Sequence, residues 1–205
     1  SPAAREYARE ELRSFLSLSD LSSARPARRW AALAAADPEL ASRNVRVAIE
    51  AATPEERVAF AGRPRRELIW ALVKLAWRTT CFRDAVLSLA LLAEAENESW
   101  SNNATGEFVD KYQIVLGGTA VPYLDRLVVL DDLLALKRDK LTTLVIKALA
   151  CAGADHYSRA ELGAIDDAAR EAEWHPSDEQ GITCVIAAPI AWKAACRSAA
   201  DVESK

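Results

Sequence analysis

Apolar residues recur at helical spacing along most of the chain, and no segment alternates apolar and polar residues over the length of a strand. The strongest pattern lies in residues 66–96, where two apolar segments flank the break at Arg78, Thr79 and Thr80. The helix predicted for the first segment has apolar residues on nearly all of its faces, so we expect it to pack against more than one neighbouring helix. The predicted core of the pair consists of Leu68, Leu72, Leu75, Phe82, Val86, Leu89 and Leu92.

Caps and prolines mark where several helices begin. Asp37-Pro38 and Thr53-Pro54 each place an N-cap residue before a proline at the first helical position, and Glu56 completes the capping-box spacing with Thr53. Gly62 and Pro64 predict the end of the short helix that follows Thr53. The other predicted helices cover residues 2–18, 23–35, 67–78, 81–96, 105–116, 122–136, 139–152, 158–174 and 177–197, with a loop at 117–122.

These segments predict a single all-α domain over residues 1–205 with about ten to twelve helices joined by short turns. Residues 66–96 and 124–152 share one layout, an apolar helix, a basic break and a second apolar helix. Such weak repetition favours an irregular α-solenoid of stacked antiparallel helix pairs. A globular helical bundle is the alternative fold.

A family resemblance comes from the polar run at residues 93–108, which contains Trp100, together with residues 75–78 before it and 118–122 after it. This region, residues 59–124, resembles the HEAT- or armadillo-like helical repeats of large bacterial multidomain proteins. Some of those proteins resemble signal-transducing NTPases of antiphage defence. The resemblance implies a non-enzymatic interaction, scaffold or sensor module whose chemistry lies in other domains. No NTPase residue carries over, because Gly117-Gly118-Thr119 lacks the lysine of a phosphate-binding loop and follows a helix.

Amino-acid composition further limits the class of protein to which this chain can belong. The chain has 205 residues, 51% of them hydrophobic and 27% charged, with a formal net charge of -4, so it can bury a core without disulfides or a metal. Its mild acidity argues against a general phosphate-binding protein. The lack of methionine, with Ser1-Pro2 at the start, predicts a fragment of a longer protein. No segment is apolar enough to predict a membrane span, and a cytoplasmic location is expected.

The cysteines and histidines give no catalytic or metal motif. Cys81, Cys151, Cys184 and Cys196 stand among apolar neighbours at spacings unlike those of zinc sites, which predicts reduced, buried thiols. His156 and His175 fall in predicted breaks. We therefore expect no catalytic residue, cofactor or metal in this chain.

The candidate binding residues are two arginine clusters and one polar break. Arg28 and Arg29 form the first cluster, Arg63, Arg65 and Arg66 form the second, and Trp100, Asn102 and Asn103 lie in the break. If helix packing brings the clusters together, their guanidinium groups would attract an anionic partner. Pairing with neighbouring carboxylates is the structural alternative, and for the asparagines it is anchoring of the inter-helix backbone. Glu94, Glu96 and Glu98 are expected to be solvated, with a nearby arginine as a possible partner.

Two functions are consistent with these patterns. The first is an interaction, scaffold or sensor module that binds a protein partner or other domains of its parent chain. The second is a HEAT-like nucleic-acid-binding protein or a DNA glycosylase-type enzyme, because HEAT-like folds also occur among DNA alkylpurine glycosylases. A continuous positive groove would favour the second function, and a surface of mixed charge would favour the first.

Overall fold

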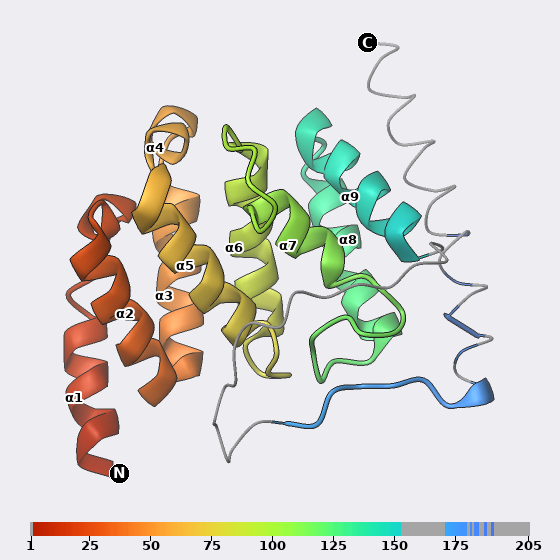
Figure 1. The fold of residues 1–205 in the computed structure, drawn as a ribbon, viewed down its shortest axis with the longest axis horizontal. Coiled ribbons are helices and arrows are strands. Elements are labelled where there is room, and N and C mark those ends of the chain that lie inside the picture. Colours follow the sequence, from red (N-terminus) through yellow and green to blue (C-terminus); the bar gives the residue numbers. More distant parts are fainter. Residues whose placement is uncertain are drawn as a thin grey trace.

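Helices make up the regular structure of the part of the chain that the computed structural model describes, which is residues 2–152, 171–179, 181, 183, 184, 187 and 190. Residues 2–152 contain nine α-helices and one 3-10 helix. The described residues contain no strand, so the all-α prediction is confirmed for them (Figure 1). The elements are α1 (Pro2–Leu12), η1 (Leu18–Leu21), α2 (Ala24–Ala36), α3 (Pro38–Ala51), α4 (Pro54–Ala59), α5 (Gly62–Leu75), α6 (Phe82–Glu94), α7 (Ala104–Asp110), α8 (Tyr123–Ala135) and α9 (Asp139–Ala152).

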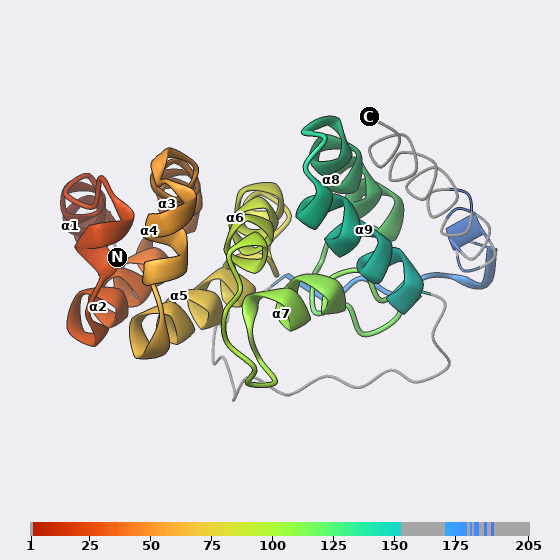
Figure 2. The same ribbon diagram turned by 90° about the horizontal axis from the view of Figure 1, so that it is seen from above.

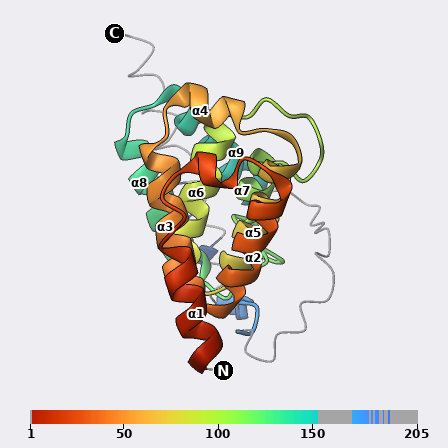
Figure 3. The same ribbon diagram turned by 90° about the vertical axis from the view of Figure 1, so that its left-hand side faces the viewer.

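The helices lie in two rows. Seen from above, α1, α3, α6 and α8 follow one another in one row, and α2, α5, α7 and α9 form the other (Figure 2). The end-on view shows α3 and α6 on one side and α2 and α5 on the other (Figure 3). Each of these eight helices contacts its neighbours within its row and at least one helix of the facing row. The main apolar core therefore lies between the two rows.

The predicted core of residues 66–96 is confirmed. All seven predicted side chains are buried, and Leu68, Leu72, Val86, Leu89 and Leu92 are fully so. The helix that carries the first three packs against α2, α3, α6 and α7, as its nearly all-round apolarity predicted. The next helix, α6, is the most enclosed element, with contacts to α3, α5, α7, α8 and α9.

Both predicted helix starts are confirmed. The carboxylate of Asp37 accepts a hydrogen bond from the Leu40 amide at 3.3 Å and lies 2.7 Å from Nε of Arg9. Thr53 Oγ1 accepts from the Glu56 amide at 3.2 Å, while the Glu56 carboxylate accepts from the Thr53 amide at 2.8 Å. This reciprocal capping box begins α4.

Several predicted helix boundaries are wrong. Gly62 begins α5 and does not close α4, which ends at Ala59. Its φ of +69° is tolerated because glycine has no Cβ, and it turns the chain directly into the new helix. Pro64 lies in the first turn of α5, where no intrahelical donor is lost, so it does not delay the helix to residue 67.

Other helices are shorter than predicted. The first ends at Leu12, and Leu16, expected on its apolar face, is 77% exposed. The helix predicted over 105–116 ends at Asp110. Residues 171–174, predicted as the end of a helix, are non-helical, and the rest of that prediction lies outside the described residues. The described residues from 178 to 190 are helical, in agreement with the predicted last helix.

Candidate functional site

The predicted arginine clusters meet at one carboxylate. Arg28 of α2 and Arg63 of α5 both pair with Glu67, through Nε atoms 3.1 and 3.6 Å from Oε1. Arg29 points elsewhere and pairs with Glu11 of α1. The structure therefore brings Arg28 and Arg63 together, as the packing hypothesis required, but with an acidic group between them.

Arg65 is not a surface residue, which corrects its place in the predicted binding cluster. Its side chain is fully buried, and Nη1 donates to the carbonyls of Arg57 and Phe60, both at 3.1 Å. Nη2 donates to the Leu92 carbonyl at 2.6 Å and lies 3.3 Å from the Glu96 carboxylate. Burial lowers the pKa of the Arg65 guanidinium, and the nearby charge of Glu96 opposes that change.

Helical spacing explains this difference among three nearly adjacent arginines. Residues three, four and seven positions after Arg65 are Leu68, Ile69 and Leu72, which are all buried. Arg65 thus lies on the core face of α5, while Arg63 and Arg66 lie on exposed faces. That spacing was readable in the sequence and marks Arg65 as the inward member of the cluster.

The polar break at 97–103 forms a short connection that covers the start of α5. Trp100 is half-buried, and the guanidinium carbon of Arg66 lies 4.7 Å from the centre of its ring. Its indole nitrogen donates to the Glu98 carboxylate. A cation over an indole ring is a stable arrangement that holds both groups at the surface.

The asparagines of this break match the structural alternative. Asn103 caps α7 by accepting from the Gly106 amide at 2.9 Å, and it donates to the Glu98 carbonyl at 3.1 Å. Asn97 donates to the Val58 carbonyl at 3.0 Å, and Asn102 is half-buried. The side chains of Asn97 and Asn103 therefore anchor the inter-helix backbone.

The three glutamates before and within this break are engaged with the fold and are not simply solvated. Glu94 pairs with Arg57 at 3.7 Å and with Arg138, and Glu96 pairs with Arg65. The Glu98 carboxylate accepts from the Gly62 amide. The expected solvated surface is therefore wrong for Glu94 and Glu96, which have the arginine partners suggested as the alternative. No group of His, Cys, Asp or Glu in the described part of the chain could hold a metal ion.

A small recess extends the arginine surface along α2 and α5. It has a volume of about 150 Å³, with alanines of α2 on one side and Trp70, Lys74 and Glu67 of α5 on the other. Trp70 is 36% exposed, and Arg63, Glu67, Trp70 and Lys74 follow one another at helical spacing. We call Arg28, Arg63, Glu67, Trp70 and Lys74 the α2–α5 surface.

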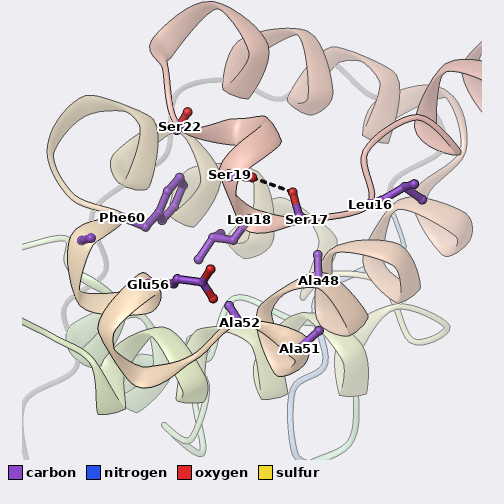
Figure 4. A pocket seen from close by; sticks show the side chains of 11 residues that line it. Leu16, Ser17, Leu18, Ser19, Ser22, Ala48, Ala51, Ala52, Glu56 and Phe60 are labelled. Atoms are coloured by element: carbon purple, nitrogen blue, oxygen red, sulfur yellow. Dashed lines mark hydrogen bonds between the residues drawn. The ribbon is translucent and has the colours of Figure 1, made fainter.

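A second recess, of about 340 Å³, lies between η1, the end of α3 and α4 (Figure 4). Its walls are mostly apolar, with Leu18, Ala48, Ala52 and Phe60 among them. Its polar side chains bond internally: Ser17 and Ser19 pair at 2.8 Å, and the Glu56 carboxylate caps α4. Nothing in the sequence pattern predicted this recess, and its lining contains none of the predicted binding residues.

Sequence reasoning also missed a second fully buried arginine, Arg126. Arg126 is fully buried near the start of α8; its Nε donates to the Val121 carbonyl at 2.8 Å. Its Nη1 donates to the carbonyls of Lys111 and Gln113 at 3.1 and 2.8 Å. Burial lowers the pKa of Arg126 to about 10, so it remains charged at neutral pH. The guanidinium thereby fixes the whole loop between α7 and α8.

The cysteines and the described histidine do not add a reactive site. Cys81 and Cys184 are buried and Cys151 is partly buried, each as a free thiol, and burial raises the pKa of all three. His175 is exposed, whereas His156 and Cys196 lie outside the described residues. A raised thiol pKa disfavours the reactive thiolate.

Comparisons of the chain with protein-family models, with curated proteins and with solved structures found no match. Within the described residues, no helix combines the length and apolarity needed to cross a membrane. The contacts and charges above are therefore the basis for inferring a function.

Proposed function

We propose that this chain is a non-enzymatic interaction module, built as stacked antiparallel helix pairs, that binds an acidic segment of a protein partner on its α2–α5 surface. The two-row packing supports an α-solenoid in which α1/α2, α3/α5, α6/α7 and α8/α9 are the pairs. The HEAT- or armadillo-like resemblance adds the proposal that the module belongs to a larger bacterial protein and serves it as a scaffold or sensor. Each pair contributes one helix to each face, which suits extended binding surfaces.

The shared carboxylate of Glu67 is the observation that carries the proposal. It lies between Arg28 and Arg63, and next to it are Trp70, Lys74 and a wall of alanines. An exposed tryptophan beside arginines is the composition typical of protein interfaces. A phosphate backbone instead favours a row of cations free of acidic neighbours. Because cations outnumber Glu67 on this surface, an acidic protein segment is the best electrostatic match.

Site-specific photocrosslinking tests the surface. A photoreactive phenylalanine derivative at Trp70, in cells that make the protein, should capture a defined protein partner. Arg63→Glu with Lys74→Glu should abolish capture, because the reversed charges repel an acidic segment. The matched control places the same reagent at Val128, an exposed position of α8, and should capture nothing. Equal capture from both positions would contradict the proposal.

Titration with labelled DNA and RNA tests the alternative. We expect no saturable binding at about 50 mM salt, where phosphate contacts are strong. The variant set is Arg28→Ala, Arg63→Ala and Arg66→Ala, since Arg65 is buried. Binding that falls steeply towards about 200 mM salt and disappears in this variant would favour the nucleic-acid function.

A further inference from the structure

A segment from late in the chain lies against two loops that come much earlier in the sequence. The loops are residues 77–80, between α5 and α6, and residues 117–120, between α7 and α8, and we call them the paired loops. Residues 171–174, with the sequence Glu-Ala-Glu-Trp, bond to both of them. Figure 1 shows this segment, in blue, running below the helices and next to the loops that connect them.

The contacts of this segment resemble those of a bound peptide. The Trp77 indole nitrogen donates to the Glu171 carbonyl at 2.8 Å, and the Thr79 amide donates to the Glu171 carboxylate at 3.2 Å. The Gly118 amide donates to the Glu173 carboxylate at 2.8 Å, and the Trp174 amide donates to the Thr119 carbonyl at 2.9 Å. Both carboxylates thus accept from backbone amides, which gives charge-assisted hydrogen bonds.

The ring of Trp174 provides the apolar part of the contact. It lies 5.3 Å from the guanidinium carbon of Arg126 and packs on the small cluster of Ile114, Tyr123, Ala152 and Cys184. The charge of Glu173 acts on Arg126 and favours its charged form, so the positive charge of Arg126 in turn favours an acidic segment nearby. Ala172, between the two glutamates, is exposed.

The paired loops are joined to each other independently of this segment. The Ala120 amide donates to the Trp77 carbonyl at 2.8 Å, and Thr119 Oγ1 donates to the same oxygen at 3.4 Å. Arg126 fixes residues 111–121 through three carbonyls. None of these bonds involves residues 171–174, so we expect the amides of Thr79 and Gly118 to keep their positions when that segment is released.

We propose that the paired loops are a binding site for a short acidic peptide that carries an aromatic residue, and that residues 171–174 occupy this site in cis until a protein partner bearing a similar peptide displaces them. The inference rests on the proposed interaction function but uses a different surface. Recognition follows from two backbone amides for carboxylates, one carbonyl for a peptide amide, and Arg126 with its apolar neighbours for an aromatic ring. Occupation in cis keeps the site closed, because a tethered segment acts at a high effective concentration.

The test measures binding of a labelled peptide of residues 171–177 to the full chain. The released variant, Glu173→Gln with Trp174→Ala, should bind the peptide at least about tenfold more tightly than the unchanged chain, in which the tethered segment competes. Trp77→Phe in the released variant should weaken binding, since it removes one donor and keeps an aromatic ring. A peptide with Glu171→Gln, Glu173→Gln and Trp174→Ala is the matched control and should not bind.

Amide hydrogen exchange separates release from unfolding. In the released variant, exchange at Thr79 and Gly118 should accelerate while the helices keep their protection. Glu171→Gln with Glu173→Gln is a second variant that retains the Trp174 ring, and it should show the same pattern if Trp174→Ala disturbs the fold. A folded released variant that exchanges rapidly at both amides and does not bind the peptide overturns the proposal.

The oligomeric state distinguishes cis from trans occupancy. We expect a monomer whose size is unchanged by Trp174→Ala. A dimer that dissociates on this change would assign the segment to a second copy and overturn occupation in cis. Neither result depends on Arg63 or Lys74. An outcome that contradicts the proposal for the paired loops is therefore distinct from one that contradicts the proposal for the α2–α5 surface.

Discussion

Two fully buried arginines, Arg65 and Arg126, hold different parts of the helical array in different ways. Arg65 donates to three carbonyls at the ends of α4 and α6 and pairs with Glu96, while Arg126 donates to three carbonyls of the loop before α8. Around Arg126 the neighbours are the rings of Tyr123 and Trp174. The Arg65 guanidinium thus joins helix ends through hydrogen bonds and an ion pair. The Arg126 guanidinium instead holds a loop and lies next to aromatic rings.

The different partners of Arg65 and Arg126 indicate which of the two regions can bind a further acidic group. A carboxylate beside a buried arginine completes the charge balance, so the Arg65 region is closed to further anions. Aromatic rings satisfy a guanidinium less completely and leave its charge to act on a neighbouring segment. The Arg126 region is therefore where an acidic peptide gains most, and residues 171–174 lie there.

Replacement of Arg65 should have the largest effect of the substitutions we consider. Arg65→Met leaves the Glu96 charge and three carbonyls without their partner, so unfolding free energy should fall by about 3–5 kcal/mol. Urea denaturation monitored by circular dichroism measures this change. Arg66→Met is the matched control; that exposed side chain should cost less than about 1 kcal/mol. Equal losses at the two positions would show that burial does not decide their roles.

Replacement of Arg126 should cost less and act locally. Arg126→Met removes hydrogen bonds to three carbonyls but leaves no ion-pair partner behind, so the expected loss is about 2–3 kcal/mol. Hydrogen exchange should accelerate in residues 111–122 while α5 and α6 stay protected. A loss larger than that of Arg65→Met would contradict the comparison.

A close approach at Gly117 tests whether Arg126 holds the loop in place. A Cβ at this position would lie 2.2 Å from Nη1 of Arg126 and 2.9 Å from the Gln113 carbonyl oxygen. Gly117→Ala should therefore cost about 1–2 kcal/mol through overpacking. In the Arg126→Met background the cost should shrink, because part of the clash is gone; the double-mutant cycle measures that coupling. Strict additivity would show that the two residues act independently.

Local sequence rules predicted the helices well where cap and core signals agree. The helix starts at Asp37 and Thr53 follow from side chains that accept a hydrogen bond from the backbone amide three residues later. The burial of the predicted core residues between Leu68 and Leu92 follows from helical spacing. The same spacing places Arg65 inward, but its charge suggested a surface role. Charge is a weaker guide than position when three carbonyls are available to a guanidinium.

Long-range contacts could not be predicted in this way. The pairing of Arg28 with Glu67 depends on how α2 packs against α5, and the bonds between residues 171–174 and the paired loops join positions 55 to 94 residues apart. The α7–α8 loop was predicted as helix up to residue 116 and as loop only from 117 to 122. Arg126, which the helical pattern did not distinguish, bonds to the carbonyls of residues 111, 113 and 121 in that segment. Such sites arise from tertiary packing, which the sequence pattern alone does not specify.

A buried carboxyl near the Arg126 loop supplies the smallest expected effect and the sharpest pH signature. Burial raises the pKa of Glu107 in α7, Lys111 partly offsets this, and Asp110 adds to it. The folded chain therefore binds a proton at Glu107 more readily than the unfolded chain does. The stability that this group contributes is present below the unfolded value of 4.5 and is lost as pH rises through the higher folded pKa.

Glu107→Gln should consequently raise stability at pH 7, by less than about 1 kcal/mol, because a neutral group of the same shape replaces a buried charge. The gain in stability should fade as pH approaches the unfolded pKa of 4.5.

Asp37→Asn is the opposite case. Burial acts to raise the pKa of Asp37, but hydrogen bonds from Arg5 and Arg9 lower it overall. Its carboxylate stabilises the fold above the unfolded value of 3.8, so the substitution should destabilise at pH 7. Urea unfolding of both variants between pH 4 and pH 7 measures the two trends, and a shared sign at pH 7 would contradict the assignment.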